Sequence, residues 1–159
     1  MSSLDSLYQQ IILEQAKTRH GADLPADQLQ VSNLPQGMGQ CHQLNPVCGD
    51  EITLRVETSS GPETSRSISG IHWSGDGCSI SMASASILSE LAIGLQAEEL
   101  QELIENFREV MRSRGKLAGD EEILGDAAAL SGVSKFPARV KCAMLAWVAA
   151  EDALMQTAS

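Results

Sequence analysis

The sequence predicts an α+β fold in which a small antiparallel sheet of about three strands packs against helices. Residues 51–57 alternate strictly between apolar and polar side chains, which is the period of a half-buried strand. Residues 79–155 instead carry apolar side chains at helical spacing, and a first helix is expected over residues 4–17. The sheet is therefore expected within about residues 38–75, between these two helical parts.

The length of 159 residues favours one domain over the whole chain, residues 1–159. A chain of this size buries an adequate hydrophobic core without disulfide bridges. A metal ion is therefore not needed to replace a missing core, and a metal site in this chain would serve another purpose.

The first helix is predicted by apolar residues at helical spacing, whose side chains are assigned to the core: Leu4, Leu7, Tyr8, Ile11 and Ile12. Residues 20–44 are polar and contain prolines and glycines, which is typical of a loop. A short strand should end this segment and lead to Asn45.

Residues 51–57 and 64–73 should form a β-hairpin. The alternation of the second strand slips near Gly70, which predicts a β-bulge there. Antiparallel pairing brings the start of one strand beside the end of its partner. We therefore expect Cys48 and Asp50, at the start of the first strand, to lie close to Cys78, just past the end of the second.

Three longer helices and one short helix are predicted in the second half of the chain. Gly94 ends the first of them, over residues 79–93. A charged amphipathic helix follows over residues 98–112, and then a short helix over residues 121–130. Pro137 suits the first turn of the last helix. The apolar residues of that helix are assigned to the core: Val140, Met144, Trp147, Val148 and Leu154.

Charge and hydropathy exclude several classes of function. Lysine and arginine number 11 against 21 aspartate and glutamate, so the formal charge is −10 and nucleic acid is not an expected partner. Residues 1–15 contain Asp5 and Glu14 and no uninterrupted apolar run, so neither a signal peptide nor a membrane span is expected. A cytoplasmic location follows, where cysteines are expected to be ligands or reactive thiols rather than disulfides.

Three short motifs each place a cysteine at the edge of a predicted element, and the first adds a carboxylate two residues later. The motifs are Asn45-Pro46-Val47-Cys48-Gly49-Asp50, Gly75-Asp76-Gly77-Cys78-Ser79-Ile80-Ser81 and Phe136-Pro137-Ala138-Arg139-Val140-Lys141-Cys142. Three sulfurs and one oxygen suit a tetrahedral zinc ion, and this mixture is unusual for a purely structural site. The candidate metal ligands are Cys48, Asp50, Cys78 and Cys142.

Thiolate character is expected at Cys78 and Cys142, because both lie near predicted helix N-termini, where backbone N–H groups and the helix dipole favour an anion. Cys48 lies on a glycine-containing turn, in a site whose carboxylate is less well matched to zinc than a thiolate. Cys48 is therefore the candidate nucleophile toward an electrophilic sulfur. Arg139 and Lys141 either offset the formal charge of the loaded site or are simply exposed.

The cysteines also have a simpler interpretation. An isolated cysteine is most often a small buried hydrophobic residue, and this chain lacks the CxxC pairs of ordinary zinc modules. Spacing alone therefore does not decide whether Cys48, Cys78 and Cys142 share one metal site. Cys41 is interpreted as a spare cysteine. The three histidines, His20, His42 and His72, are dispersed and are interpreted as surface or loop residues.

At these motifs the sequence resembles the SufU branch of the IscU/NifU-N-like family of iron–sulfur cluster assembly proteins. The matching residues are Asn45-Pro46-x-Cys48-Gly49-Asp50, Gly77-Cys78-Ser79-Ile80-Ser81-x-Ala83-Ser84-Ala85-Ser86 and Phe136-Pro137-x-Arg139-x-Lys141-Cys142-Ala143-x-Leu145-x-Trp147. The resemblance covers roughly residues 38–150. It implies a SufU/IscU-like fold, and that Cys48, Asp50, Cys78 and Cys142 bind one zinc ion per chain.

The resemblance also implies a function. A member of this branch accepts persulfide sulfur from SufS, a pyridoxal-phosphate cysteine desulfurase, and passes it toward cluster assembly, so the chain would act as a zinc-dependent sulfurtransferase. Cys48 matches the sulfur acceptor, and a histidine of the desulfurase would replace that cysteine on zinc. Arg139 would compensate charge or contact the partner. Downstream SUF cluster-assembly proteins are further expected partners, whereas nucleic acid and membranes are not.

Two other functions stay open from the sequence: an iron–sulfur scaffold of the IscU kind, and a structural zinc domain for protein interactions. The scaffold branch carries a histidine directly before its last cysteine, where this chain has Lys141, which cannot bind metal while protonated. Residues 97–115 resemble the additional helical region of the SufU branch. Residues 14–44 depart from the family pattern, which leaves the identity of the contacting desulfurase open.

Overall fold

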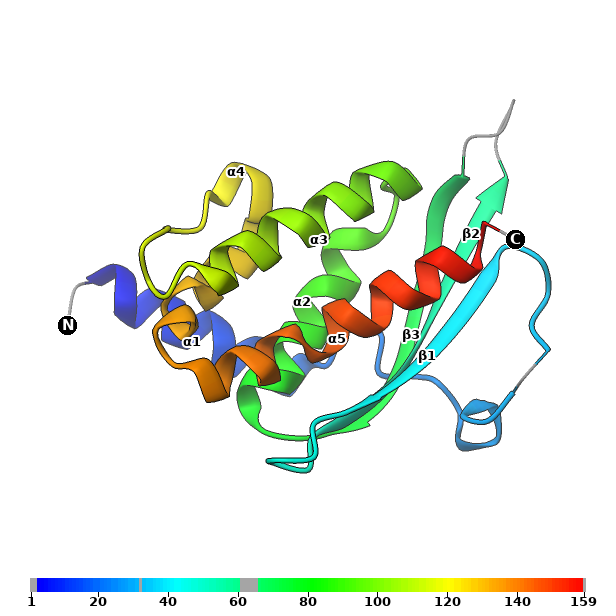
Figure 1. Ribbon diagram of the computed structural model, residues 1–159, viewed down its shortest axis with the longest axis horizontal. Coiled ribbons are helices and arrows are strands. Elements are labelled where there is room, and N and C mark those ends of the chain that lie inside the picture. The colour runs from blue at the N-terminus through cyan, green and yellow to red at the C-terminus, as the bar shows by residue number, and fades with distance from the viewer. Residues whose placement is uncertain (1–2, 32, 61–65, 159) are drawn as a thin grey trace.

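The structure is a computed structural model that describes residues 3–31, 33–60 and 66–158. A three-stranded antiparallel sheet stands at one end of the molecule, and most of the helical part lies to one side of it (Figure 1). The strands, in spatial order, are β1 (Met38–Leu44), β2 (Glu51–Ser60) and β3 (Arg66–Asp76). This confirms the predicted α+β fold with a small antiparallel sheet.

Strands β2 and β3 form the predicted hairpin. Glu57 of β2 pairs with Gly70 of β3, but the next residue, Thr58, pairs with Ile68, so β3 contributes one additional residue. This confirms the bulge predicted near Gly70. The first two residues of the predicted return strand lie outside the described residues.

The helices begin and end close to the predicted boundaries, except after residue 120. They are α1 (Ser3–Thr18), α2 (Ser79–Ala92), α3 (Ala97–Arg112), α4 (Glu121–Leu124) and α5 (Pro137–Gln156), with the 3-10 helices η1 (Ala26–Gln28) and η2 (Gly125–Lys135). The single short helix predicted over residues 121–130 is wrong, because α-helix stops at Leu124. Gly125 has a φ of 52°, which a right-handed α-helix does not accept, and the chain continues in 3-10 form. Within the described ranges, no helix is long and apolar enough to cross a lipid bilayer.

Helix α2 packs closely against α5, because its middle residues are buried serines and alanines. The indole N–H of Trp147 in α5 donates to Ser84 Oγ at 2.8 Å. The Ser84 hydroxyl donates in turn to the carbonyl of Ala143 at 2.6 Å. One buried serine therefore ties the two helices together. The Phe107 ring of α3 stacks on Trp147 with its centroid 4.0 Å away, which joins a third helix to this core.

Helix α5 lies across the sheet and contacts β1 and β2 (Figure 1). Trp147 and Leu154 are buried, as predicted. Val140 and Met144 are half-buried and pack against the core. Val148 is half-buried and lines a groove, so its assignment to the core is wrong. The assignment of Leu4 and Leu7 of α1 to the core is also wrong, because both side chains are exposed.

We predict that Gly39→Ala destabilises the fold. A Cβ atom added at Gly39 would stand 1.9 Å from the carbonyl oxygen of Ala153, so β1 and α5 could not keep their separation. Overpacking of this kind costs roughly 1–3 kcal/mol of unfolding free energy, which urea denaturation measures. Gly132→Ala is the control, because a Cβ atom there meets nothing within 4 Å. Equal urea midpoints for the two variants would contradict the close packing of β1 on α5.

We also predict a loss of stability at alkaline pH that originates at Cys41. Burial and then the Asp152 carboxylate raise the pKa of the Cys41 thiol to about 11, although Gln43 opposes this shift. In the unfolded chain the thiol ionises near its ordinary value of 9.0, so the unfolded state binds fewer protons between the two values. The contribution of Cys41 to stability is therefore complete below pH 9.0 and is lost as the pH rises from 9.0 to about 11. Urea midpoints should fall more steeply with pH for the native chain than for Cys41→Ala, and parallel curves would refute the assignment.

Candidate metal centre

The turn between β1 and β2 carries Cys48 and Asp50, and Asn45 fixes its shape. The backbone N–H of Asn45 donates to the carbonyl of Asp50, and that of Gly49 donates to the carbonyl of Asn45, each at 2.8 Å. The side-chain oxygen of Asn45 accepts from the N–H of Val47 at 3.1 Å. Gly49 has a φ of 78°, a conformation that favours glycine. The turn therefore holds Cys48 and Asp50 on the same side, two residues apart.

Cys78 and Cys142 reach the same place from two helices. Cys78 is the N-cap residue of α2, shortly after β3 ends. The pairing of Glu51 with Asp76 brings the end of β3 beside the start of β2, so Cys78 lies close to Asp50, as predicted. Cys48 lies in one group with Asp50 and Cys142, which does not include Cys78. Cys142 lies in the second turn of α5 and is buried.

The side-chain atoms of three of the four candidate ligands lie at separations that one metal ion would impose. Those of Cys48, Asp50 and Cys142 all lie within 4.8 Å of one another. The sulfurs of Cys48 and Cys142 are 3.8 Å apart, which matches two sulfurs bound tetrahedrally to zinc at roughly 2.3 Å each. Cys78 lies outside this group of three residues, although its Sγ is 3.6 Å from Asp50 Oδ2. The two thiols and the carboxylate of the group are donors that fit zinc.

Asp50 is a buried carboxylate that stays ionised. Burial alone would raise its pKa, but hydrogen bonds from the Ser81 hydroxyl and from the thiols of Cys142, Cys48 and Cys78 lower the pKa below its ordinary value. Only 4% of Asp50 is exposed, so these donors, rather than water, stabilise its charge. The carboxylate is therefore already in the form that binds a cation.

The environment of Cys142 differs from the one that the sequence predicts. Burial, the hydrogen bond to Asp50 and the charge of Cys78 raise the pKa of Cys142 to about 12. The expected thiolate stabilisation by a helix terminus is wrong for Cys142, because it lies beyond the first turn, where the dipole effect has decayed. A thiol must lose its proton to bind a metal, so the stabilising charge at Cys142 would have to come from the ion.

Cys48 differs from the other cysteines in its exposure. It is exposed, Cys78 is half-buried, and Cys41 and Cys142 are buried. Cys41 lies in the core of the sheet and takes no part in the group. Cys48 is therefore the thiol that a second protein can reach.

Arg139 and Lys141 are exposed near the start of α5. Neither side chain forms a hydrogen bond or an ion pair with any residue in the part of the chain that the structure describes. Lys141 lines a groove of about 250 Å³ between α5 and the turn that carries Cys48. The other lining residues are mostly apolar: Gln43, Leu44, Asn45, Pro46, Val47, Met144, Leu145 and Val148.

The histidines do not belong to the cysteine group. Each is partly exposed and reaches a carboxylate outside that group, as expected for surface or loop residues. The pairs are His20 with Glu90, His42 with Glu51 and His72 with Asp23.

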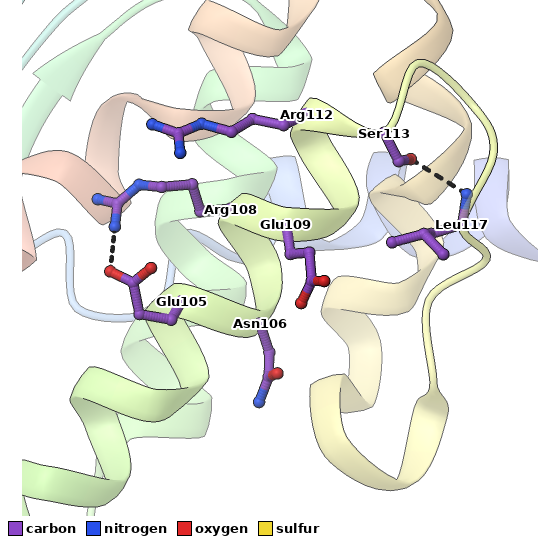
Figure 2. Close-up of a pocket in the computed structure, with 7 residues that line it drawn as sticks. All are labelled: Glu105, Asn106, Arg108, Glu109, Arg112, Ser113 and Leu117. Atoms are coloured by element: carbon purple, nitrogen blue, oxygen red, sulfur yellow. Dashed lines mark hydrogen bonds and ion pairs between the residues drawn. The ribbon is translucent and has the colours of Figure 1, made fainter.

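A second hollow, of about 440 Å³, lies along α3 and the loop that follows it (Figure 2). Its polar lining includes Arg108, whose guanidinium pairs with Glu105 and, at 2.6 Å, with Glu151 of α5. No cysteine lines this hollow, so it is separate from the metal-binding group. The ion pair of Arg108 with Glu151 joins α3 to α5.

Two residues of the motifs, Asn45 and Ser81, have roles that sequence reasoning missed. An asparagine followed by proline is typical of a turn, and this signal could have identified Asn45 as the organiser of the first motif. The Ser81 hydroxyl donates to Asp50 Oδ2. Its position three residues after Cys78, on the same face of a helix, is the signal that could have identified it.

Comparisons with known proteins agree in sequence and in fold. Residues 9–154 match the family described as NifU-like N terminal domain. The chain is 36% identical over 150 residues to the zinc-dependent sulfurtransferase SufU of Bacillus subtilis strain 168, covering 94% of this chain and 90% of that protein. It is 34% identical over 159 residues to the iron–sulfur cluster assembly scaffold protein IscU of Streptococcus pyogenes serotype M1, covering 100% of this chain and 89% of that protein.

A solved structure from Fervidobacterium islandicum AW-1 has the same fold. It is described as a candidate iron–sulfur cluster assembly scaffold protein for the SUF system, and it superposes with a TM-score of 0.69 at 29% identity. The match covers 96% of this chain and 99% of that chain. The resemblance indicated by the cysteine motifs is thus confirmed, and the chain belongs to the NifU-like N-terminal domain family.

Proposed function

We propose that this protein serves in iron–sulfur cluster assembly as a zinc-dependent sulfur acceptor, in which Cys48 takes persulfide sulfur from a SufS-type cysteine desulfurase. The observation that carries the proposal is the position of Cys48. It is an exposed thiol whose sulfur lies 3.8 Å from that of buried Cys142, in one group with Asp50. The 36% identity to a protein named as a zinc-dependent sulfurtransferase supports the same function.

Four side chains would hold one zinc ion per chain: Cys48, Asp50, Cys78 and Cys142. Bound zinc would keep their thiols ionised near neutral pH. Without the ion, the buried thiol of Cys142 would stay protonated, because its pKa is raised. One carboxylate among three thiolates makes a less closely matched set than four thiolates. Exchange of a ligand should therefore be easier here than in a structural site with four cysteines.

The transfer itself is a thiol–persulfide exchange. The Cys48 thiolate attacks the terminal sulfur of the cysteine persulfide on the desulfurase, and a new S–S bond forms at Cys48 Sγ. The S–S bond within the original persulfide breaks, and the cysteine of the desulfurase leaves as a thiolate. The proton on the terminal sulfur stays with the transferred atom, so no external oxidant or reductant is required. Cys48 ends as a persulfide that a later acceptor can receive.

The desulfurase would approach from the side on which Cys48 is exposed. Lys141 lines the groove beside the turn that carries Cys48, and Arg139 lies two residues earlier on α5. Both are exposed bases on a protein with a formal charge of −10. They are therefore suited to contact acidic groups of a partner. Pyridoxal phosphate would belong to the desulfurase, downstream SUF proteins would receive the sulfur, and the reaction would take place in the cytoplasm.

An iron–sulfur scaffold is the second candidate, because the Streptococcus relative is named as one. Cysteine thiolates are also the usual ligands of iron–sulfur clusters. Lys141 argues against this function. It stands directly before Cys142, where the scaffold branch carries a histidine, and a protonated lysine has no lone pair to offer a metal. The sulfur-acceptor function is therefore preferred.

The metal content provides the first prediction for this function. The purified protein should be colourless and contain one zinc ion per chain, measured by elemental analysis. Asp50→Ala should lower zinc affinity because it removes one of the four ligands, whereas Cys41→Ala should leave zinc affinity unchanged. Removing zinc with a chelator should lower the Tm, because the ion binds the folded state. Iron and sulfide in equal amounts, with a coloured cluster after anaerobic reconstitution, would favour the scaffold instead.

A second prediction concerns Cys48→Ala in an assay of cysteine desulfurase turnover. The native chain should stimulate the enzyme, and the variant should lose the stimulation because it has no thiolate to accept sulfur. The variant should keep its fold, since Cys48 is exposed and a substitution there disturbs little packing. Cys41→Ala is the matched control and should still stimulate turnover. Loss of stability in Cys48→Ala with full stimulation would indicate a structural zinc domain.

A further inference from the structure

Asp50 is confined by two residues from the junction of β3 and α2. The carboxylate and Ser81 are both buried, with 4% and 2% of their surfaces exposed. The Ser81 hydroxyl donates to Asp50 Oδ2. Gly77 also lies against the carboxylate, because a Cβ atom added there would stand 2.8 Å from Asp50 Cγ. The Asp50 carboxylate therefore packs against Gly77, and the hydrogen bond from Ser81 orients it.

The position of the Ser81 hydroxyl is set by helix α2. Cys78 is the N-cap residue of this helix and Ser81 follows three residues later, so the two side chains share one face. Their Sγ and Oγ atoms are 3.5 Å apart. One turn further along, Ser84 connects α2 to Trp147 of α5. Helix α2 therefore fixes the positions of Cys78 and of the Ser81 hydroxyl relative to each other.

The Ser81 hydroxyl differs in kind from the other donors to Asp50. The thiol of Cys78 also donates to Asp50 Oδ2, at 3.6 Å. A cysteine that binds a metal does so as a thiolate and has no proton left to donate. Among the described residues, Ser81 is then the one side-chain donor that remains to Asp50. The direction of the carboxylate in the loaded site would thus depend on a single hydroxyl.

We infer that Ser81 is a positioning residue, whose hydroxyl orients Asp50 toward the metal and holds it there while Cys48 leaves to accept sulfur. The inference rests on the proposed function, because it concerns the same group of ligands. Hydrogen bonds from outside the ligand set typically account for about 10-fold to 100-fold in metal affinity. A weaker hold on Asp50 should therefore appear as weaker binding and faster release of zinc.

The test is a double-mutant cycle in which zinc affinity is measured by competition with a coloured chelator. Ser81→Ala should weaken zinc binding by about 10-fold or more and speed its release to the chelator. In an Asp50→Ala background the same substitution should have no further effect, since no carboxylate is left to orient. Cadmium, which thiolates bind strongly, extends the cycle to variants that hold zinc too weakly to measure.

Ser89→Ala is the matched control for the loss of a buried hydroxyl from α2. Ser89 is buried like Ser81, but its hydroxyl donates to the carbonyl of Ala85 within the same helix, at 2.8 Å. It should leave zinc affinity unchanged. Urea midpoints of the metal-free Ser81→Ala and Ser89→Ala variants should be similar, which separates a role in positioning from a role in stability.

The outcomes separate this inference from the function on which it rests. Unchanged zinc affinity in Ser81→Ala would overturn the positioning role and leave the sulfur-acceptor function intact. Ser81→Ala could also lower zinc affinity equally in the native and Asp50→Ala backgrounds. That result would overturn the positioning role too, because the effect would not depend on the carboxylate. If the native chain did not bind zinc at all, both the positioning role of Ser81 and the zinc-dependent sulfur-acceptor function would be refuted.

Discussion

The packing of α2 against α5 is the constraint on which the rest of the site depends. Ligands from separate segments can share an ion only if the segments keep fixed positions, and the hydrogen bonds from Trp147 to Ser84 and onward to α5 supply that restraint. The start of α2 carries Cys78, and the second turn of α5 carries Cys142. The hairpin of β2 and β3 then brings Asp50 to Cys78. The site is therefore a property of the whole core.

The four side chains divide into a fixed part and a movable part. Asp50 and Cys142 are buried against packed elements, and Cys78 is attached to the end of a long helix. Cys48 is exposed, beside a glycine that has open space around it. A group built in this way can exchange one thiolate while the remaining side chains keep their places. This division suits a protein that accepts an atom and passes it on.

Local patterns predicted most of the fold, because alternation and helical spacing record burial on one face. They did not predict the break at Gly125, since a glycine in a left-handed conformation leaves no periodic signal. The motifs identified the members of the site, but spacings of 28 and 94 residues hold no information about distance. The raised pKa of Cys142 and the bond from Ser81 to Asp50 arise from tertiary burial, so no local pattern records them.

The separation of 94 residues between Cys48 and Cys142 also determines when the site can exist during synthesis. A ribosome builds the chain from its N-terminus, so the segment with Cys48 emerges well before α5 does. Until then the nascent chain offers two thiols and one carboxylate of the site, without the helix that positions them. The group of candidate ligands is therefore complete only when the fold is complete. A truncated product that lacked α5 would also lack Cys142 and could not form the complete group of candidate ligands.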